Sequence, residues 1–325
     1  MKKVFLILIL VFVTIILSAD YAESFLSIFP TSIGEGTRGN LYSYSDNTNP
    51  MFFYNPANSS TDISDKIFIG YEHKFLYSNI SHFNSASFIM PTIRSVRIGF
   101  GYINQIISGI PIYPEYSDTV SFEPRGYFSD NAHCILLNVS YIYTNDPISK
   151  YEIAGGLNIK SIIHSIYENM GIGAGLDLGI NNSYKFNTFS EQVPSKVYLG
   201  FVLKDIGGTK ITWDTDSKTT DTREMMYGIG LSYSSDIRIA QSQIFLELNY
   251  SNREGGTVGF SFIYKYNQMI GVFAGENEYI NADIGYTQRK IGGGCFIDIL
   301  GFGIYYGISK SEIGFNNSVS IRYRV

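Results

Sequence analysis

The sequence contains few charged residues and no apolar run long enough to cross a membrane as a helix. Charged side chains make up 16% of the 325 residues, whereas ordinary soluble domains contain about 25%. The net charge of −5 provides no basic stripe, which argues against a nucleic acid partner. The longest apolar run, from Val4 to Leu17 and interrupted by Thr14, falls below the roughly 20 residues of a transmembrane helix. We therefore expect neither a nucleic-acid-binding domain nor a helical membrane protein.

Cysteine and histidine are also scarce, which bears on metal and redox chemistry. Alternation places Cys134 and Cys295 on opposite faces of separate predicted strands, so we expect two isolated thiols. The histidines show no His-x-x-x-His spacing, and the cysteines are not clustered. We therefore predict no metal site and no cofactor. The histidines are His73, His82, His133 and His164.

The sequence offers no convincing set of catalytic residues. A hydrolase needs a nucleophile, a histidine and an orienting group close together, and nothing in the sequence brings the candidates Ser140 and His133 together. The segment 205–224 contains Asp214, Asp216 and Asp221 but does not form a calcium loop, because Lys218 occupies the third alternate position. A solvated loop explains them better. We predict that the protein is not an enzyme.

The N-terminus has the pattern of a secretory signal peptide. Lys2 and Lys3 precede the apolar run, and Ser18-Ala19 supplies small residues before a polar one. We expect residues 1–19 to be removed on export, with the cleavage site uncertain by a few positions.

Between Met170 and Asn181, apolar residues alternate with glycine, aspartate and asparagine. This two-residue period predicts a strand with one apolar face and one small or polar face. Glycine suits a crowded interior better than the water-facing side of an ordinary sheet, so the pattern favours a membrane β-barrel over a soluble secreted β-sandwich. We expect Leu176 and Leu178 to face lipid and to reject charge. Gly173, on the opposite face, is expected to tolerate serine.

The same alternation recurs along the chain and predicts an all-β, transmembrane, antiparallel up-and-down barrel of about 14 strands. The segment 278–288 is ambiguous and would raise the number to 15 or 16. The predicted strands cover residues 66–76, 83–91, 96–104, 131–143, 151–162, 170–181, 196–204, 225–234, 242–250, 256–264, 269–276, 290–298, 301–308 and 317–325.

The predicted connections alternate between the outside and the inside of the cell envelope. The long ones are 105–130, 205–224 and 277–289, and an even strand number with both ends periplasmic places them all outside the cell. Long outer loops and short inner turns are typical of bacterial outer-membrane barrels, which predicts that location and outer-membrane lipids as partners. The connection 182–195 is longer than this rule predicts.

Several charged residues occupy inward-facing positions on the predicted strands. Both signs are present, so we expect them to pair with one another or with material inside the barrel. A selectivity site for a charged solute is the alternative. These residues are Arg97, Lys160, Asp177, Lys204 and Glu247.

Residues 20–62 carry apolar bulk without a strand pattern. A barrel of this size is too wide for its own side chains to fill, and its interior face is rich in glycine. We therefore predict that residues 20–62 form a plug inside a barrel formed by residues 63–325. The expected apolar contacts of the plug are Phe25, Leu26, Ile28, Phe29, Phe52 and Phe53.

Two short motifs in this segment resemble the leader of the PorV/PorQ family of FadL-like outer-membrane barrels. Phe25-Leu26-Ser27-Ile28 matches the start of that leader, and Tyr54-Asn55-Pro56-Ala57 matches the Asn-Pro-Ala element that closes it. Arg38-Gly39 stands where the family usually has Met-Gly-Gly, so this part departs from the pattern. The resemblance implies a 14-stranded barrel with a luminal N-terminal segment. Family members include a component of type IX secretion and, more distantly, transporters of long-chain fatty acids.

Two functions remain open. In the first, which we favour slightly, the barrel stays shut and docks secreted or secretion-machinery proteins at the cell surface. In the second, it transports hydrophobic small molecules across the outer membrane, as FadL-like proteins do. Exposed apolar patches usually mark binding sites, and the loop 105–130 carries candidate docking residues. These are Tyr113, Tyr116, Phe122, Tyr127 and Phe128.

Overall fold

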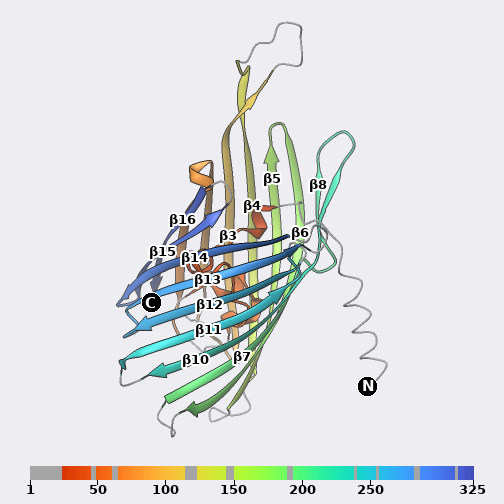
Figure 1. Cartoon of the computed structure of the whole chain (residues 1–325). Helices are drawn as coiled ribbons and strands as arrows, with labels where there is room; N and C mark the ends of the chain where they lie inside the picture. The colour runs from red at the N-terminus through yellow and green to blue at the C-terminus, as the bar shows by residue number, and fades with distance from the viewer. Residues whose placement is uncertain are drawn as a thin grey trace.

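The structure is a computed structural model that describes residues 24–44, 49–60, 65–113, 123–143, 150–188, 193–237, 240–253, 256–281, 286–311 and 314–325. The predicted signal peptide lies outside these residues. The described part of the chain forms one antiparallel sheet of 16 strands, of which β8 and β9 form a side hairpin. The other 14 strands close into a barrel (Figure 1). None of the helices in the described ranges is long and apolar enough to cross a membrane.

Each wall strand pairs with its neighbour, β7 pairs with β10, and β16 pairs back onto β1 to close the barrel. The predicted antiparallel barrel is therefore confirmed, and each predicted strand overlaps one of the wall strands. The wall strands are β1 (Phe68–Leu76), β2 (Ser81–Ile89), β3 (Val96–Ile112), β4 (Gly126–Tyr143), β5 (Tyr151–Ile166), β6 (Asn169–Thr188), β7 (Val193–Lys204), β10 (Met226–Ile237), β11 (Ser242–Ser251), β12 (Thr257–Tyr266), β13 (Ile270–Asn281), β14 (Tyr286–Ile299), β15 (Phe302–Ser311) and β16 (Gly314–Arg324).

The two faces of the wall differ as the alternation indicates. On β6, Leu176 and Leu178 are 44% and 46% exposed on the outside, whereas Asp177 between them is 3% exposed and faces the lumen. Large apolar side chains lie exposed around the outside on nearly every wall strand. A continuous apolar exterior of this kind is stable only against lipid.

Aromatic rings line the outer face near the β6–β7 end of the barrel. Tyr151 of β5 and Tyr184 of β6 have ring centroids 4.7 Å apart. Phe186 continues the row and lies 6.4 Å from Tyr233 of β10. Aromatic girdles at the edges of an apolar band mark where a barrel wall meets the membrane–water interface.

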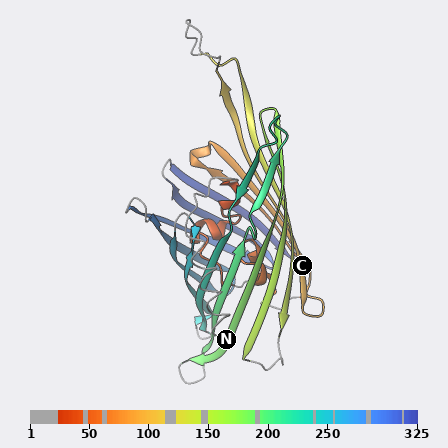
Figure 2. The same ribbon diagram turned by 90° about the vertical axis from the view of Figure 1, so that its right-hand side faces the viewer.

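Three of the predicted loops contain more strand than expected. β3 and β4 continue pairing as far as Ile112 and Gly126, so a long hairpin rises beyond the rest of the wall (Figures 1 and 2). The connection 182–195 is largely the continuation of β6 and β7, and 205–224 contains the hairpin β8 (Thr209–Trp213) and β9 (Thr220–Arg223). Outside the membrane, lipid no longer imposes alternating polarity, so pairing continues where the sequence pattern ends. The described residues of the segment 278–288 add no separate strand, because they belong to the ends of β13 and β14.

The N-terminal segment, defined here as residues 24–44 and 49–60, lies inside the wall (Figure 1). Its helices are only one or two turns long: η1 (Ser24–Ser27), α2 (Ser32–Thr37), η2 (Met51–Phe53) and η3 (Pro56–Ser59). A further short turn, η4 (Tyr77–Asn79), joins β1 to β2. Most residues of the N-terminal segment are buried, and all its aromatic side chains except Tyr42 belong to the main apolar cluster or pack against it.

Glycines on the luminal face of the wall allow the N-terminal segment to pack directly against the wall backbone. A Cβ on Gly200 would overlap the carbonyl oxygen of Tyr42, and one on Gly307 would overlap that of Ser32. Any larger side chain at these positions would push the segment off the wall. The same close approach occurs at Gly156, Gly179, Gly275 and Gly292.

Candidate functional site

Asparagines on the wall hold the backbone of the N-terminal segment. Short 3₁₀ turns leave many carbonyls unpaired, and a buried carbonyl needs a donor. The wall supplies these donors from four strands. Each asparagine donates a hydrogen bond from its Nδ2 to a backbone carbonyl of the segment: Asn138 to Pro56 at 3.0 Å, Asn158 to Phe52 at 3.0 Å, Asn181 to Ser43 at 2.9 Å and Asn277 to Arg38 at 2.8 Å.

Three of the five inward charges predicted from the sequence also contact this backbone. Arg97 donates to the carbonyl of Ser59 at 2.8 Å, and Lys204 donates to that of Phe53 at 2.8 Å. Glu247 does the reverse, because its Oε1 accepts the N–H groups of Tyr42 at 2.6 Å and Ser43 at 3.2 Å. The wall thus both donates hydrogen bonds to the backbone of the segment and accepts hydrogen bonds from it.

The other two inward charges, Lys160 and Asp177, form a buried network with residues beyond β7. Lys160 Nζ lies 2.7 Å from Asp177 Oδ1 and also pairs with Asp205. Arg223 Nε lies 2.9 Å from the second oxygen of Asp205. Asp205 and Arg223 are not predicted from the sequence, since both lie in a segment without the strand periodicity that would assign them to the luminal face.

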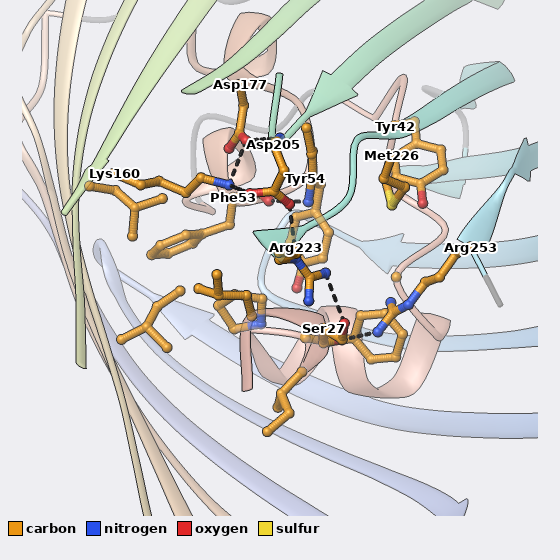
Figure 3. Close-up of a pocket in the computed structure, with 18 residues that line it drawn as sticks. Ser27, Tyr42, Phe53, Tyr54, Lys160, Asp177, Asp205, Arg223, Met226 and Arg253 are labelled. Carbon is orange, nitrogen blue, oxygen red and sulfur yellow. Dashed lines mark hydrogen bonds and ion pairs between the residues drawn. The ribbon is translucent and has the colours of Figure 1, made fainter. Parts of the chain in front are cut away.

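A small cavity lies between this network and the start of the N-terminal segment (Figure 3). Its apolar side is formed by Leu26, Ile28, Phe29 and Phe53 of the segment with Ile103, Leu136 and Met226 of the wall. Its polar side is formed by Lys160, Asp177, Lys204, Asp205, Arg223 and Arg253.

The cavity has room for only about 50 Å³ of contents. That is space for a few waters, whereas a benzene-sized molecule occupies a cavity of about 150 Å³. Residues 26–29, which are half-buried, form one side of the cavity. Arg223 donates to Ser27 Oγ at 2.9 Å, Arg253 donates to the Ser27 carbonyl, and the Arg253 guanidinium lies 5.4 Å from the Phe29 ring. Any solute larger than water must displace these contacts.

A second set of charges fixes α2 to the wall. Lys74 Nζ of β1 lies 3.0 Å from Glu35 and donates to the Thr31 carbonyl at 3.1 Å. Arg38 lies 3.3 Å from the other oxygen of Glu35, which also accepts from Ser309. Burial alone would raise the pKa of Glu35, but Lys74, Arg38 and the Ser309 hydroxyl together hold it below its ordinary value. Glu35 is therefore a buried carboxylate with its charge compensated.

The Tyr54-Asn55-Pro56-Ala57 motif forms a turn against the wall. The Asn55 side chain accepts the Ala57 N–H at 3.0 Å and caps η3, which Pro56 begins. Its Nδ2 donates to the Tyr42 carbonyl at 2.7 Å, so the motif joins the two halves of the N-terminal segment. Tyr54 OH contacts Thr31 Oγ1 at 2.8 Å, beside α2.

The β3–β4 hairpin carries the predicted docking residues. Tyr113 and Tyr127 are 59% and 66% exposed, whereas Phe128 packs its ring 5.6 Å from that of Tyr167. Tyr116 and Phe122 lie outside the described residues. An open groove of about 400 Å³ runs between this hairpin and the β5–β6 turn, lined by Ile112, Phe128, Ile166, Tyr167 and Asn169.

The structure does not bring together the hydrolase candidates. Ser140 is buried in the lumen and contacts Ser59, whereas His133 lies on the outer face beside Tyr102. Cys134 is buried and Cys295 is exposed, and the two form no disulfide with each other. No three His, Cys, Asp or Glu residues in the described ranges are grouped closely enough to hold a metal ion.

Comparison with known proteins identifies the fold. No family model matches the sequence, and no curated protein matches it. The toluene transporter TbuX of Ralstonia pickettii superimposes with a TM-score of 0.51 at 10% identity, over 92% of this chain and 98% of that one. A deletion mutant of the monoaromatic hydrocarbon channel TodX gives 0.51 at 9% identity, over 90% and 97%. The chain therefore has the fold of FadL-like barrels of the bacterial outer membrane.

Proposed function

We propose that the protein is a FadL-like outer-membrane channel for small hydrophobic or amphipathic molecules, with the N-terminal segment as its plug. The observation that carries this proposal is the cavity between plug and wall, which has one apolar and one charged side. A molecule with an apolar body and a polar end complements such a site. The barrel fold, shared with two proteins described as a toluene transporter and a hydrocarbon channel, supports the same function.

The proposal assigns a role to each part of the chain. Residues 1–19 direct export and are removed, residues 20–62 close the barrel, and residues 63–325 span the membrane. Transport requires residues 26–29 to swing away, because the cavity as it stands is too small for the solute. The segment from α2 to η3 stays in place, since wall donors hold its backbone along its length.

Uptake measurements in a host without hydrocarbon channels test this function. Cells that produce the protein should accumulate radiolabelled toluene faster than cells without it. Ile103→Trp fills the cavity from β3 and should abolish the gain, whereas Phe100→Trp, on the lipid-facing side of the same strand, should leave it intact. Equal uptake with and without the protein would exclude a hydrocarbon channel.

Docking of other proteins at the cell surface is the second candidate, and the β3–β4 hairpin favours it. The exposed Tyr113 and Tyr127 stand beyond the wall, where lipid cannot cover them, beside an apolar groove. A role in type IX secretion like that of some PorV/PorQ proteins would use this surface. Phe128→Ala should then reduce crosslinking of secreted proteins to the barrel without changing toluene uptake.

A further inference from the structure

The aromatic ring of Phe29 lies beside two guanidinium groups at the edge of the cavity. Arg38 Cζ is 5.1 Å from the centroid of the ring, and Arg253 Cζ is 5.4 Å from it. A guanidinium within about 6 Å over an aromatic face is attracted by the negative charge of that face. Phe29 therefore makes two cation–π contacts, one within the N-terminal segment and one with a residue that follows β11.

The guanidinium of Arg38 is only partly satisfied by hydrogen bonds. Its Nη1 donates to Ser309 Oγ at 2.7 Å and lies 3.3 Å from Glu35, but its buried Nε has no hydrogen-bond partner among the described residues. A buried donor without an acceptor is unfavourable, and an aromatic face acts as a weak acceptor. A saturated hydrocarbon in the place of Phe29 would not compensate this group, whereas another aromatic ring would.

The space that the Phe29 ring occupies beside Gly39, Arg38 and Arg253 is called here the ring slot. A Cβ on Gly39 would lie 2.2 Å from Cε1 of Phe29, so the ring rests on bare backbone. Phe29, Gly39 and Arg253 all line the cavity, and Phe29 is only half-buried. Departure of Phe29 would therefore add the space of one six-membered ring to a cavity that has room for about 50 Å³.

The ring slot is coupled to the contacts that keep the cavity closed. Arg253 donates to the carbonyl of Ser27, and Arg223 donates to its hydroxyl at 2.9 Å (Figure 3). Ser27 and Phe29 are two positions apart, so a movement that breaks the contact of Arg253 with Ser27 also takes Phe29 from the ring slot. Opening of the cavity and emptying of the ring slot are therefore one event.

We propose that the ring of an aromatic solute replaces Phe29 in the ring slot, so that Arg38 and Arg253 select aromatic over saturated hydrocarbons. This inference rests on the proposed channel function and names the residues that set its specificity. An aromatic solute restores the two cation–π contacts that are lost when Phe29 leaves, so their number stays the same. A saturated ring of the same size restores neither contact and binds more weakly.

Paired uptake of toluene and methylcyclohexane, which are similar in size but differ in aromaticity, tests the ring slot. Cells that produce the full-length protein receive both labelled solutes together, and uptake by cells without the protein is subtracted. Differences in protein level then cancel in the ratio of the two uptakes. Arg253→Met keeps an unbranched side chain but removes the guanidinium. It should lower the toluene-to-methylcyclohexane ratio by about two- to fivefold, the effect of one cation–π contact at a partly exposed site.

Phe29→Leu should have a different effect, because it removes the ring that every solute has to displace. The half-saturating concentrations of both solutes should fall by the same factor, and their uptake ratio should stay at the wild-type value. Lys265→Met is the matched control. It removes a cation–π contact with Tyr44, at 5.9 Å, that lies away from the cavity, so it should change neither the ratio nor the half-saturating concentrations.

The outcomes separate the ring slot from the channel. A wild-type ratio in Arg253→Met, or an equal fall of the ratio in Lys265→Met, would overturn the ring slot and leave the channel standing. No uptake of either solute above background would exclude the channel and the ring slot with it.

Crystals of the unaltered protein grown with 4-bromotoluene give an answer that does not depend on the folding of a variant. Bromine scatters anomalously and therefore marks the position of the solute. A bromotoluene ring beside Arg38 and Arg253, with Phe29 displaced, supports the proposal. A bromine peak elsewhere in the lumen, with Phe29 still in the ring slot, overturns it.

Discussion

Gly155 and Gly156 are adjacent on β5 but have opposite surroundings. A Cβ on Gly155 would meet nothing within 4 Å, whereas one on Gly156 would overlap the backbone of Pro56 and Ala57. The function of a wall residue therefore depends on whether the N-terminal segment touches it. Alternation identifies the face on which a residue lies, but the sequence alone does not reveal which luminal positions the segment contacts.

Gly156→Ala should destabilise the protein by about 1–3 kcal/mol, the range for overpacking a close contact. Gly155→Ala should change the free energy of unfolding by less than about 0.5 kcal/mol, as outward surface substitutions do. The shift in the temperature at which the folded, fast-migrating band disappears from SDS gels measures both. Equal shifts would show that the segment does not rest on Gly156.

Acid should loosen the contact of α2 with the wall. The pKa of Glu35 is depressed in the folded protein, so its contribution to stability is present above its unfolded pKa, about 4.3, and is lost as pH falls through the lower folded value. The unfolding temperature should drop in this acidic range, and Glu35→Gln should show a smaller drop.

Glu276→Gln serves as the control for this acid effect. Glu276 pairs with Arg289, whose side chain is 71% exposed, and exposed pairs contribute little. This variant should keep the full acid sensitivity of the wild type. An unchanged profile in Glu35→Gln would contradict the assignment.

At the scale of elements, the sequence predicts the strands well and the connections poorly. Within the membrane, each strand has lipid on one side and a crowded lumen on the other, so the residues on its two faces differ in polarity. This alternation makes strands such as β6 recognisable in the sequence. Beyond the membrane this constraint ends. The hairpin β8–β9 and the far end of β3–β4 are therefore predicted from the sequence as loops. For the same reason the sequence does not predict Asp205 and Arg223 as residues of the candidate site. Lys160 and Asp177 lie inside the alternating region, so the sequence does predict a face for them, the luminal one.

Gly173 shows on a single strand that alternation does not reveal which residues a neighbouring element contacts. The sequence predicts that it tolerates serine, but β8 pairs with that part of β6, and a Cβ on Gly173 would lie 2.7 Å from the Lys210 carbonyl oxygen and the Ile211 side chain. We now expect Gly173→Ser to be destabilising.

A charged residue on the outer face of β6 should be destabilising in the middle of the strand and tolerated near its end. Leu176→Arg should reduce stability by about 2–4 kcal/mol at mid-membrane, whereas near the interface the loss is about 0–1 kcal/mol. Asn182→Arg, on the same face but near the aromatic row, is the matched control. Denaturant titration of the barrel refolded in lipid vesicles measures both. Similar losses at the two positions would mean that the lipid boundary lies elsewhere.

At the scale of the whole molecule, closure rests on two separate parts of the chain. The wall closes through β1 and β16, and the N-terminal segment occupies the space within it. The sequence predicts the barrel through the number of strands, and it predicts a luminal plug through apolar bulk without alternation. It did not indicate that asparagines on the wall would satisfy the backbone of the segment, since a luminal asparagine looks the same whether it faces protein or water.

Removal of residues 24–58 with the signal peptide retained should leave an inserted barrel with much higher single-channel conductance in planar bilayers. The reason is that the segment fills a lumen which the wall side chains do not fill themselves. The full-length protein is the control and should conduct little. Equal conductance of the two proteins would exclude the plug and would weaken the transport proposal.

The way in which the N-terminal segment is held also sets an order of events during folding. Its carbonyls find donors on β4, β5, β6 and β13, and Ser32 contacts Ser318, 286 positions away. Such distant contacts form late, because long loops must close before they can be made. The part of the chain that is synthesised early is therefore among the last to become ordered. Until the wall is complete, its aromatic residues remain exposed, and a periplasmic chaperone would have to protect them during that interval.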